Sequence, residues 1–295
     1  MSGFAVEVRD LTARYDRTVA LDAVSFTIRP GVITGLLGRN GSGKTTLLSL
    51  LAAFRRRSSG TVLVDGEDPW ENGRVLAGTC LIRESGDVLP DRPLSETLRF
   101  VADRRPLFDR DLADRLLDTF ELDRKAQPRR LSRGKRSVFG VVLGIASRAP
   151  LTMLDEVHLG MDAPSRYAFY DALLADWLEH PRTIVLSSHL IGEIERLLED
   201  VVVLDRGVVL TVAGADTLRS SGFTVTGPVE SVAAFVAGRD VVARQQLGRT
   251  AQATLVGTHH DDREQASRAG LELGPVALQD LFVHLTDRAN TEATR

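Results

Sequence analysis

The most informative segment of the chain is Gly38-Arg39-Asn40-Gly41-Ser42-Gly43-Lys44-Thr45, which fits the pattern G-x-x-x-x-G-K-[ST]. The apolar run VITGLL (32–37) precedes it, and the apolar run KTTLLSLLAAF (44–54) begins within it. These runs predict a buried strand and a buried helix, so the glycine-rich segment is expected to connect the two. Such a loop wraps backbone N–H groups around phosphate, and the start of the helix adds partial positive charge. The segment therefore predicts a phosphate-binding loop in an α/β core.

The side chains of this loop predict how it would hold a nucleotide. Lys44 is expected to reach the β- and γ-phosphates of a nucleoside triphosphate, and the Thr45 hydroxyl is expected to bind Mg²⁺. The glycines allow the backbone to wrap closely around the phosphates. The nucleotide-binding positions expected in this segment are Gly38, Asn40, Gly41, Ser42, Gly43, Lys44, Thr45 and Thr46.

A second apolar run ends in two carboxylates. LTML (151–154) has the composition of a buried parallel strand, and Asp155 and Glu156 follow it directly. Because adjacent strand residues face opposite ways, Asp155 can hold Mg²⁺ while Glu156 polarises the attacking water. A strand ending in two acids is by itself also compatible with solvated surface groups. Its place on a second core strand, 111 residues after Lys44, favours the metal and catalytic roles.

The composition excludes several classes of protein. The hydrophobic fraction of 43% and the charged fraction of 26% are typical of a globular chain rather than a disordered one. A net charge of −3 provides no overall basic excess for a nucleic acid or an anionic membrane. No apolar run approaches the length of about 18 residues that a membrane span needs, and no secretory signal is visible. Any membrane span is therefore expected to come from a partner.

Two other features have ordinary interpretations. The single cysteine, Cys80, excludes an internal disulfide and a cysteine-based zinc site, and it favours a reducing compartment. We interpret Cys80 as a small buried apolar residue. The stretch His259-His260-Asp261-Asp262 contains residue types that bind metals, but we predict a polar loop there.

The pattern along the chain indicates two domains, as its length of 295 residues also suggests. Alternating apolar and polar residues near the start predict an N-terminal β subdomain, and helical periodicity predicts a helical subdomain at about 85–150. After about residue 215, glycines punctuate short alternating strands and helices. We expect a nucleotide-binding domain at 1–215 and a small α+β accessory domain at 216–295.

Over roughly residues 4–215, the chain resembles the nucleotide-binding subunit of an ABC transporter. Six landmarks occur in the order of that family: an aromatic residue that stacks on adenine, the phosphate-binding loop, a signature, two acids, a D-loop and a switch histidine. In this chain they are Tyr15, 38–46, 131–135 (LSRGK), Asp155-Glu156, 160–162 (GMD) and Ser188-His189.

This resemblance implies a P-loop NTPase core with a mixed sheet, and ATP and Mg²⁺ as its cofactors. It implies that Glu156 and His189 are catalytic and that Thr45 and Asp155 bind the metal. It further implies nucleotide contacts from Tyr15, Ser132, Gly134 and Asp162.

Two positions depart from the pattern of the family. The usual Q-loop glutamine is Glu84 here, where a carboxylate would either ligate the metal or repel nucleotide until Mg²⁺ neutralises it. Glu84 is thus expected to bind both nucleotide and metal. The signature reads LSRGK instead of LSGGQ, which adds Arg133 and Lys135. These cations would either attract the ATP of a partner subunit or form a solvated basic face.

The resemblance implies an ATPase subunit that drives a separate integral-membrane permease from the cytoplasmic face of the membrane. It also implies a homodimer, since the LSRGK segment of one copy completes the site of the other. The tail PVALQDLFVHLT resembles the closing segment of exporter-type subunits. A soluble ABC-type ATPase acting on DNA or ribosomes is the first alternative, but heptad arms, a second cassette and a basic tail are lacking, so no nucleic acid partner is expected. A small-molecule kinase is the second, and the signature, the D-loop and His189 argue against it.

Overall fold

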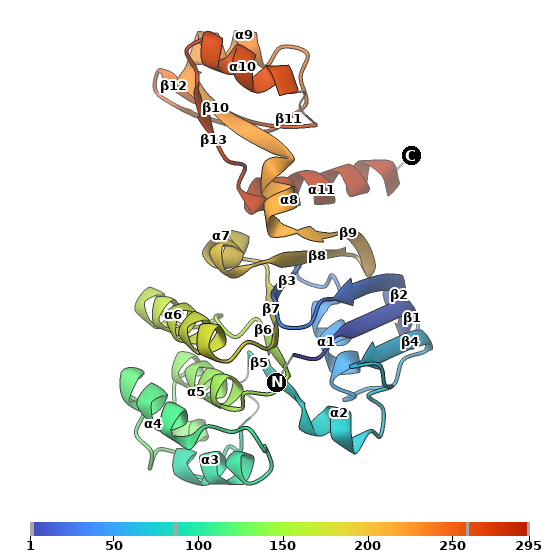
Figure 1. Ribbon diagram of the computed structural model, residues 1–295, viewed down its shortest axis with the longest axis vertical. Helices are drawn as coiled ribbons and strands as arrows, with labels where there is room; N and C mark the ends of the chain where they lie inside the picture. Colours follow the sequence, from blue (N-terminus) through green and yellow to red (C-terminus); the bar gives the residue numbers. More distant parts are fainter. Residues whose placement is uncertain (1–2, 85–87, 258–259, 294–295) are drawn as a thin grey trace. The chain divides into compact units, whose positions relative to one another are not determined.

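The computed structural model describes residues 3–84, 88–257 and 260–293 (Figure 1). The chain forms two compact units. One consists of Met1–His189 and Val202–Thr211, and the other of Leu190–Val201 and Val212–Arg295. The segment Leu190–Val201 therefore groups with the C-terminal unit, which differs from the expected division at 215/216. That division stays a prediction.

A six-stranded sheet in the order β5-β6-β7-β3-β8-β9 provides the framework for the phosphate-binding loop. The neighbours β5–β6, β6–β7 and β7–β3 pair in parallel. Every residue of β3, β6 and β7 is buried, which is why their sequences read as continuous apolar runs. The strands are Ile33–Leu37 (β3), Thr79–Arg83 (β5), Leu151–Asp155 (β6), Thr183–Ser188 (β7), Asp200–Asp205 (β8) and Val208–Gly214 (β9).

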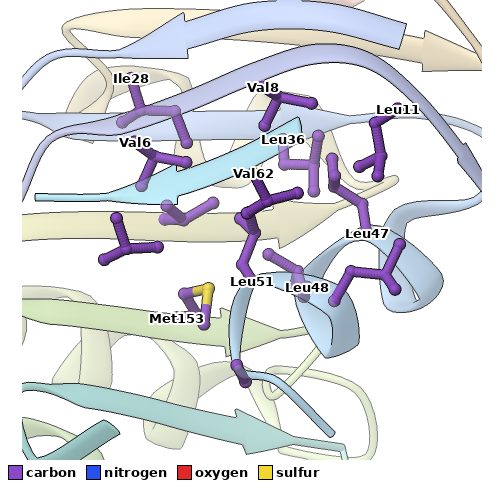
Figure 2. Close-up of a cluster of buried hydrophobic side chains, with 14 of the residues drawn as sticks. Val6, Val8, Leu11, Ile28, Leu36, Leu47, Leu48, Leu51, Val62 and Met153 are labelled. Atoms are coloured by element: carbon purple, nitrogen blue, oxygen red, sulfur yellow. The ribbon is translucent and has the colours of Figure 1, made fainter. Parts of the chain in front are cut away.

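An antiparallel three-stranded sheet in the order β2-β1-β4 forms the N-terminal part of the first unit. Its strands are Val6–Tyr15 (β1), Thr18–Ile28 (β2) and Ser59–Val64 (β4), and helix α1 is Lys44–Leu51. The apolar side chains of this sheet, of α1 and of the parallel strands form one core (Figure 2). Helix α1 is shorter than the apolar run 44–54, because Ala53 adopts a left-handed φ of 54°. The core fixes α1, and with it the loop that precedes it.

The expected helical region at about 85–150 contains three α-helices after β5 (Figure 1). Their inner faces are apolar: Leu116 and Leu117 of α4 are buried, and α5 is buried from Ser137 to Ala146. A Cβ at Gly144 would lie 3.1 Å from side-chain atoms of Ile82 and Leu154, so α5 packs closely on the sheet. The elements of this part are α3 (Leu94–Ala102), α4 (Arg110–Thr119), η1 (Pro128–Arg130) and α5 (Arg133–Ala146), while the short helix α2 (Gly73–Ala77) precedes β5.

A buried group of charges ties α6 (Ala163–Glu179) to the segments on either side of it in the chain. The carboxylate of Asp176 lies 2.9 Å from the guanidinium of Arg148, which follows α5, and 2.7 Å from that of Arg182, which precedes β7. Arg148 also pairs with Asp109 at 3.0 Å, so two cations meet two anions. Burial lowers the pKa of Arg182, and the neighbouring Asp176 carboxylate opposes that shift.

The C-terminal unit contains a four-stranded antiparallel sheet in the order β11-β12-β10-β13. The chain order of strands and helices from β10 to β13 is βαββαβ, a ferredoxin-like arrangement. Its core includes Phe223, Phe235 and Leu255. The elements are α7 (Ile191–Ile194), η2 (Glu195–Leu197), α8 (Ala215–Ser220), β10 (Gly222–Pro228), α9 (Val229–Phe235), β11 (Val241–Leu247), β12 (Thr250–Val256), α10 (His260–Arg268), β13 (Glu272–Gly274) and α11 (Leu278–Ala293).

One local prediction in this unit was wrong. The stretch expected to be a polar loop at 259–262 contributes His260, Asp261 and Asp262 to the start of α10, while His259 lies outside the described residues. The acids at the first turn favour this helix, because they face its positive end. In the part of the chain that the structure describes, no helix has the length and apolar character needed to cross a bilayer.

Candidate active site

The phosphate-binding loop has a backbone that glycine alone fits well. Gly41 and Gly43 adopt left-handed φ angles of 79° and 107°. A Cβ at Gly43 would lie 2.7 Å from the carbonyl oxygen of Ala20, and one at Gly38 would lie 2.4 Å from that of Leu204. The loop is therefore held tightly between neighbouring backbone segments, in the conformation that directs N–H groups toward a phosphate.

Lys44 lies inside this loop and is almost completely buried. Its Nζ donates to the carbonyl oxygens of Gly38 at 2.7 Å and Arg39 at 3.2 Å. The same Nζ lies 3.2 Å from Oε1 of Glu156. The ammonium group is thus fixed at the loop by three oxygen partners, where a phosphate oxygen would find it already oriented.

The two side chains expected to hold Mg²⁺ are in contact. Thr45 Oγ1 donates to Asp155 Oδ2 at 2.7 Å, and Ser187 Oγ donates to the other oxygen of Asp155, also at 2.7 Å. No group of three His, Cys, Asp or Glu side chains suited to a metal occurs among the described residues. Magnesium in nucleotide sites takes one or two protein ligands besides phosphate and water. Thr45 and Asp155 fit that pattern.

Glu156 directly follows β6 in a strained conformation. Its φ is 52°, which lies in the left-handed region and is uncommon for a residue other than glycine. Its N–H donates to the carbonyl of Ser187 at 3.2 Å, and its Oε2 lies 2.9 Å from Nδ1 of His189. The strained backbone turns Glu156 away from the direction of Asp155, so the two acids serve different partners. Glu156 and His189, the two residues expected to be catalytic, are in contact.

His158 is part of the same cluster and was missed by the sequence analysis. Its Nε2 lies 3.2 Å from Oγ of Ser188 and 3.6 Å from Oε2 of Glu156. Burial lowers its pKa to about 4, and electrostatic interactions with His189, Arg166 and Lys44 lower it further, so the imidazole is neutral at physiological pH. The available signal was a histidine in the loop directly after the two acids.

A cavity of about 810 Å³ lies over this cluster, large enough for a nucleotide. Both Thr45 and Glu156 line it, together with Glu84 and Arg133. The structure therefore brings the phosphate-binding loop, the two acids at the end of β6 and the Q-loop position to one surface. The full set of lining residues is Thr18, Val19, Ala20, Asn40, Gly41, Ser42, Gly43, Lys44, Thr45, Thr46, Arg83, Glu84, Arg133, Asp155, Glu156 and Leu159.

Tyr15 does not line this cavity in the described part of the chain. The guanidinium of Arg55 lies over its ring, 4.8 Å from the ring centroid. The cavity is bordered instead by Thr18, Val19 and Ala20 on β2. One face of the Tyr15 ring is therefore occupied by a cation, and the expected stacking of adenine on Tyr15 stays a prediction.

Three further expected nucleotide contacts lie outside the described cavity and hold local structure. Ser132 caps α5, its Oγ accepting from the N–H of Lys135 at 3.2 Å. Asp162 caps α6 and accepts from the N–H of Ser165 at 2.9 Å. A Cβ at Gly134 would lie 2.4 Å from the carbonyl oxygen of Gly160, so the signature and the D-loop are in close contact.

The two departures from the family pattern meet each other. The guanidinium of Arg133, at the first residue of α5, forms an ion pair with the carboxylate of Glu84, which follows β5. Ser137 Oγ donates to the carbonyl of Glu84 at 3.1 Å. Glu84 therefore has a cation of its own chain beside it, and its expected binding of metal stays a prediction.

Comparison with known proteins identifies the family. A family model described as ABC transporter matches residues 21–158. The ABC transporter ATP-binding protein YtrB of Bacillus subtilis (strain 168) is 30% identical over 214 residues, which cover 72% of this chain and 73% of that protein. The chain belongs to the ABC transporter family. It is an ATP-binding domain of that family and an ATPase, as the resemblance in the sequence implied.

Other relatives of this ABC ATPase differ in how much of each chain they match. The mycobactin import ATP-binding/permease protein IrtB of Mycolicibacterium thermoresistibile is 31% identical, over 74% of this chain but 39% of that protein. The Nod factor export ATP-binding protein I of Ralstonia nicotianae is 28% identical, over 96% of this chain and 94% of that protein. A solved structure, an ATP binding subunit of an ABC transporter, has a TM-score of 0.66 at 25% identity over 73% of this chain and 92% of that one. The predicted P-loop NTPase fold with a mixed sheet is confirmed.

Proposed function

We propose that the chain is the Mg²⁺-dependent ATPase subunit of an exporter and that two copies drive a separate integral-membrane permease at the cytoplasmic face of the membrane. The catalytic part of this proposal rests on the contacts that side chains make with one another at one cavity. Lys44 at the loop, Thr45 against Asp155, and Glu156 against His189 are the groups that ATP hydrolysis needs.

In this proposal each side chain has one role. Lys44 binds the β- and γ-phosphates, Thr45 and Asp155 hold Mg²⁺, and Glu156 accepts a proton from the attacking water. Bound Mg²⁺ would neutralise charge on the β- and γ-phosphates. His189, in contact with the Glu156 carboxylate, orients it. The role of Glu156 as a base is supported by its place at the cavity and by its strained backbone.

The dimeric part of the proposal comes from residues outside the cavity. Ser132, Gly134 and Asp162 belong to the signature and the D-loop, but none of them lines the described cavity of this chain. A second copy would bring its own Ser132 and Gly134 to the open side of the ATP. The site would then be complete only between two copies.

The transport part of the proposal comes from the relatives. The Nod factor export protein aligns with nearly the full length of this chain and is named as an ATP-binding protein. This favours export and a permease on a separate chain. IrtB, which is named for import and as a fused ATP-binding/permease protein, represents the alternative. Coexpression with a membrane protein encoded beside this chain tests the separate permease, and stimulated ATPase activity of the purified complex is the expected result.

Calorimetric titration with Mg-ATP tests the nucleotide site. Lys44→Ala should abolish tight ATP binding while the protein remains folded, because the variant removes the buried ammonium group that the carbonyl oxygens of the loop hold in place. Lys125→Ala is the matched control, since Lys125 is exposed and lies outside the cavity. An unchanged ATP affinity in folded Lys44→Ala protein would contradict the assignment.

A further inference from the structure

His158 lies between the ends of two core strands. It follows β6 in the chain, and its side chain reaches Ser188, the last residue of β7. Both residues are buried, with 3% of His158 and 0% of Ser188 exposed. A buried polar side chain at the edge of an active site is held there by specific partners, because burying it without them is costly.

Two imidazoles flank the same oxygen of Glu156. Nδ1 of His189 lies 2.9 Å from Oε2, and Nε2 of His158 lies 3.6 Å from the same atom. Lys44 lies beside the other oxygen, Oε1. The His158 and His189 rings are 6.5 Å apart, so they approach the carboxylate from different sides. His158 does not line the described cavity, so it would act on a bound nucleotide through a neighbouring side chain, and Glu156 is the neighbour that lines the cavity.

The neutral state of His158 suits a supporting role. A charged imidazole here would be repelled by the cations Arg166 and Lys44 and would interact unfavourably with His189 when that ring is protonated. In the tautomer that carries the proton on Nε2, a neutral imidazole directs this one N–H between Ser188 Oγ and Glu156 Oε2, without adding a positive charge beside the phosphates. Its hydrogen-bond partner Ser188 is fixed in a fully buried strand, which gives the imidazole a rigid support.

We propose that His158 is a positioning residue for ATP hydrolysis: it links Ser188 to Glu156 and holds the Glu156 carboxylate toward the cavity. The link matters because Glu156 sits on a strained backbone, at a φ of 52°, with no regular secondary structure to fix its side chain. This inference rests on the proposed role of Glu156 as the base.

Two variants of His158 with side chains of similar size test whether the residue positions Glu156 or only fills space in the core. His158→Gln keeps an N–H group near the place of Nε2, whereas His158→Met keeps the volume and loses the donor. We expect kcat to fall by about tenfold or more in His158→Met, because a misplaced catalytic group slows the chemical step. KM for ATP and ATP affinity should stay near wild type in both variants, and His158→Gln should recover most of kcat.

The double variant with Glu156→Gln distinguishes failure of this inference from failure of the proposed function. If His158 acts through Glu156, His158→Met should cause no further loss of residual activity in the Glu156→Gln background. A Glu156→Gln protein with wild-type activity would instead overturn the proposed role of Glu156. Equal kcat values for His158→Met and wild type, or an equal loss in His158→Met and His158→Gln, would overturn the positioning role.

Nitrogen NMR of histidine-labelled protein provides a readout independent of activity. The Nε2 resonance of His158 should move in Glu156→Gln, while that of His180, 44% exposed and outside the cavity, should not. This measurement uses a protein with His158 intact, so it decides the question even if His158→Met fails to fold. An unmoved His158 resonance would show that the two side chains do not interact.

Discussion

The pair Glu84–Arg133 places two opposite charges on the rim of the nucleotide cavity. Metal-free ATP is highly negative, so it would be attracted by Arg133 alone and repelled by Glu84 alone. With both present, the two effects largely cancel. The pair is partly exposed, with 72% of the Arg133 side chain and 32% of the Glu84 side chain accessible, so each effect is expected to be modest.

This balance predicts opposite results for the two single variants. Glu84→Gln should strengthen binding of metal-free ATP, and Arg133→Ala should weaken it, each by about two- to fivefold. Mg-ATP affinity should change less, and the double variant should resemble wild type. ATP titrations with Mg²⁺ and with EDTA measure the ratio of the two affinities, with Arg129→Ala as an exposed control. Equal affinities for metal-free ATP in Glu84→Gln, Arg133→Ala and wild type would show that this pair of charges does not act on the nucleotide.

His158 also predicts a pH dependence of stability. Its pKa is lowered to about 4, below the ordinary histidine value of 6.5, so between these values the unfolded chain binds a proton that the folded protein excludes. The contribution of His158 to the free energy of unfolding is therefore complete above about pH 6.5. It should fall by roughly 3 kcal/mol as the pH drops to about 4. His158→Gln should flatten this dependence, and His284→Gln, in the C-terminal unit, should not. Urea unfolding followed by tryptophan fluorescence checks it, since Trp70 and Trp177 both belong to the first unit.

At this scale the sequence predicted the groups that a contiguous motif defines. Lys44, Thr45, Asp155 and Glu156 lie where the pattern of the loop and of the strand end put them. The pairs His158–Ser188 and Glu84–Arg133 were not foreseen, because they join residues 30 and 49 positions apart through the packing of strands and helices.

At the scale of elements, the Asp176 cluster holds α6 against the segments around it. The carboxylate is almost completely buried and contacts two arginines, one after α5 and one before β7. Local sequence patterns predicted neither α6 nor the pairing of Asp176 with Arg148, 28 residues away. Such pairs depend on the order of the strands, which local patterns do not contain.

Asp176→Asn should destabilise the first unit by about 3–5 kcal/mol, because it leaves Arg148 and Arg182 short of a buried counter-charge. Glu179→Gln on the same helix is the control; Glu179 is exposed, and its change should stay within about 0.5 kcal/mol. Urea unfolding monitored by fluorescence suits this comparison, since Trp177 lies on α6 and donates to the carbonyl of Arg182 at 2.9 Å. Similar midpoints for Asp176→Asn and wild type would mean that packing alone holds α6.

At the scale of the whole molecule, the sequence predicted a small α+β unit after the nucleotide domain, but not its strand order. The order β11-β12-β10-β13 requires β10 to pair with both β12 and β13, which are far from it in the chain. Leu190–Val201 joins this unit although it lies between β7 and the main part of β8 in the chain, and Glu195 accepts a hydrogen bond from the N–H of Leu278 at 3.0 Å. The strand order and the inclusion of Leu190–Val201 in this unit both depend on contacts between segments that are distant in the chain.

The homodimer proposal makes the last prediction, which concerns two copies of the chain. Lys44→Ala removes the phosphate contact within a copy, and Ser132→Arg blocks the signature that this copy would offer to the other. Each variant alone should be nearly inactive, since both of its sites carry a defect. In a mixed dimer, however, the intact loop of the Ser132→Arg copy faces the intact signature of the Lys44→Ala copy.

Mixing equal amounts of the two inactive variants should therefore restore hydrolysis, to roughly a quarter of the wild-type rate if copies pair at random. Phosphate release from ATP measures the recovery, and mixing Lys44→Ala with Lys44→Ala/Ser132→Arg is the control, because that mixture contains no intact loop. Recovery requires a site shared between copies, because no single chain in the mixture holds all the groups. A mixture as inactive as its components would mean that Ser132 acts within its own chain, as the cap of α5, and the proposal of a shared site would be wrong.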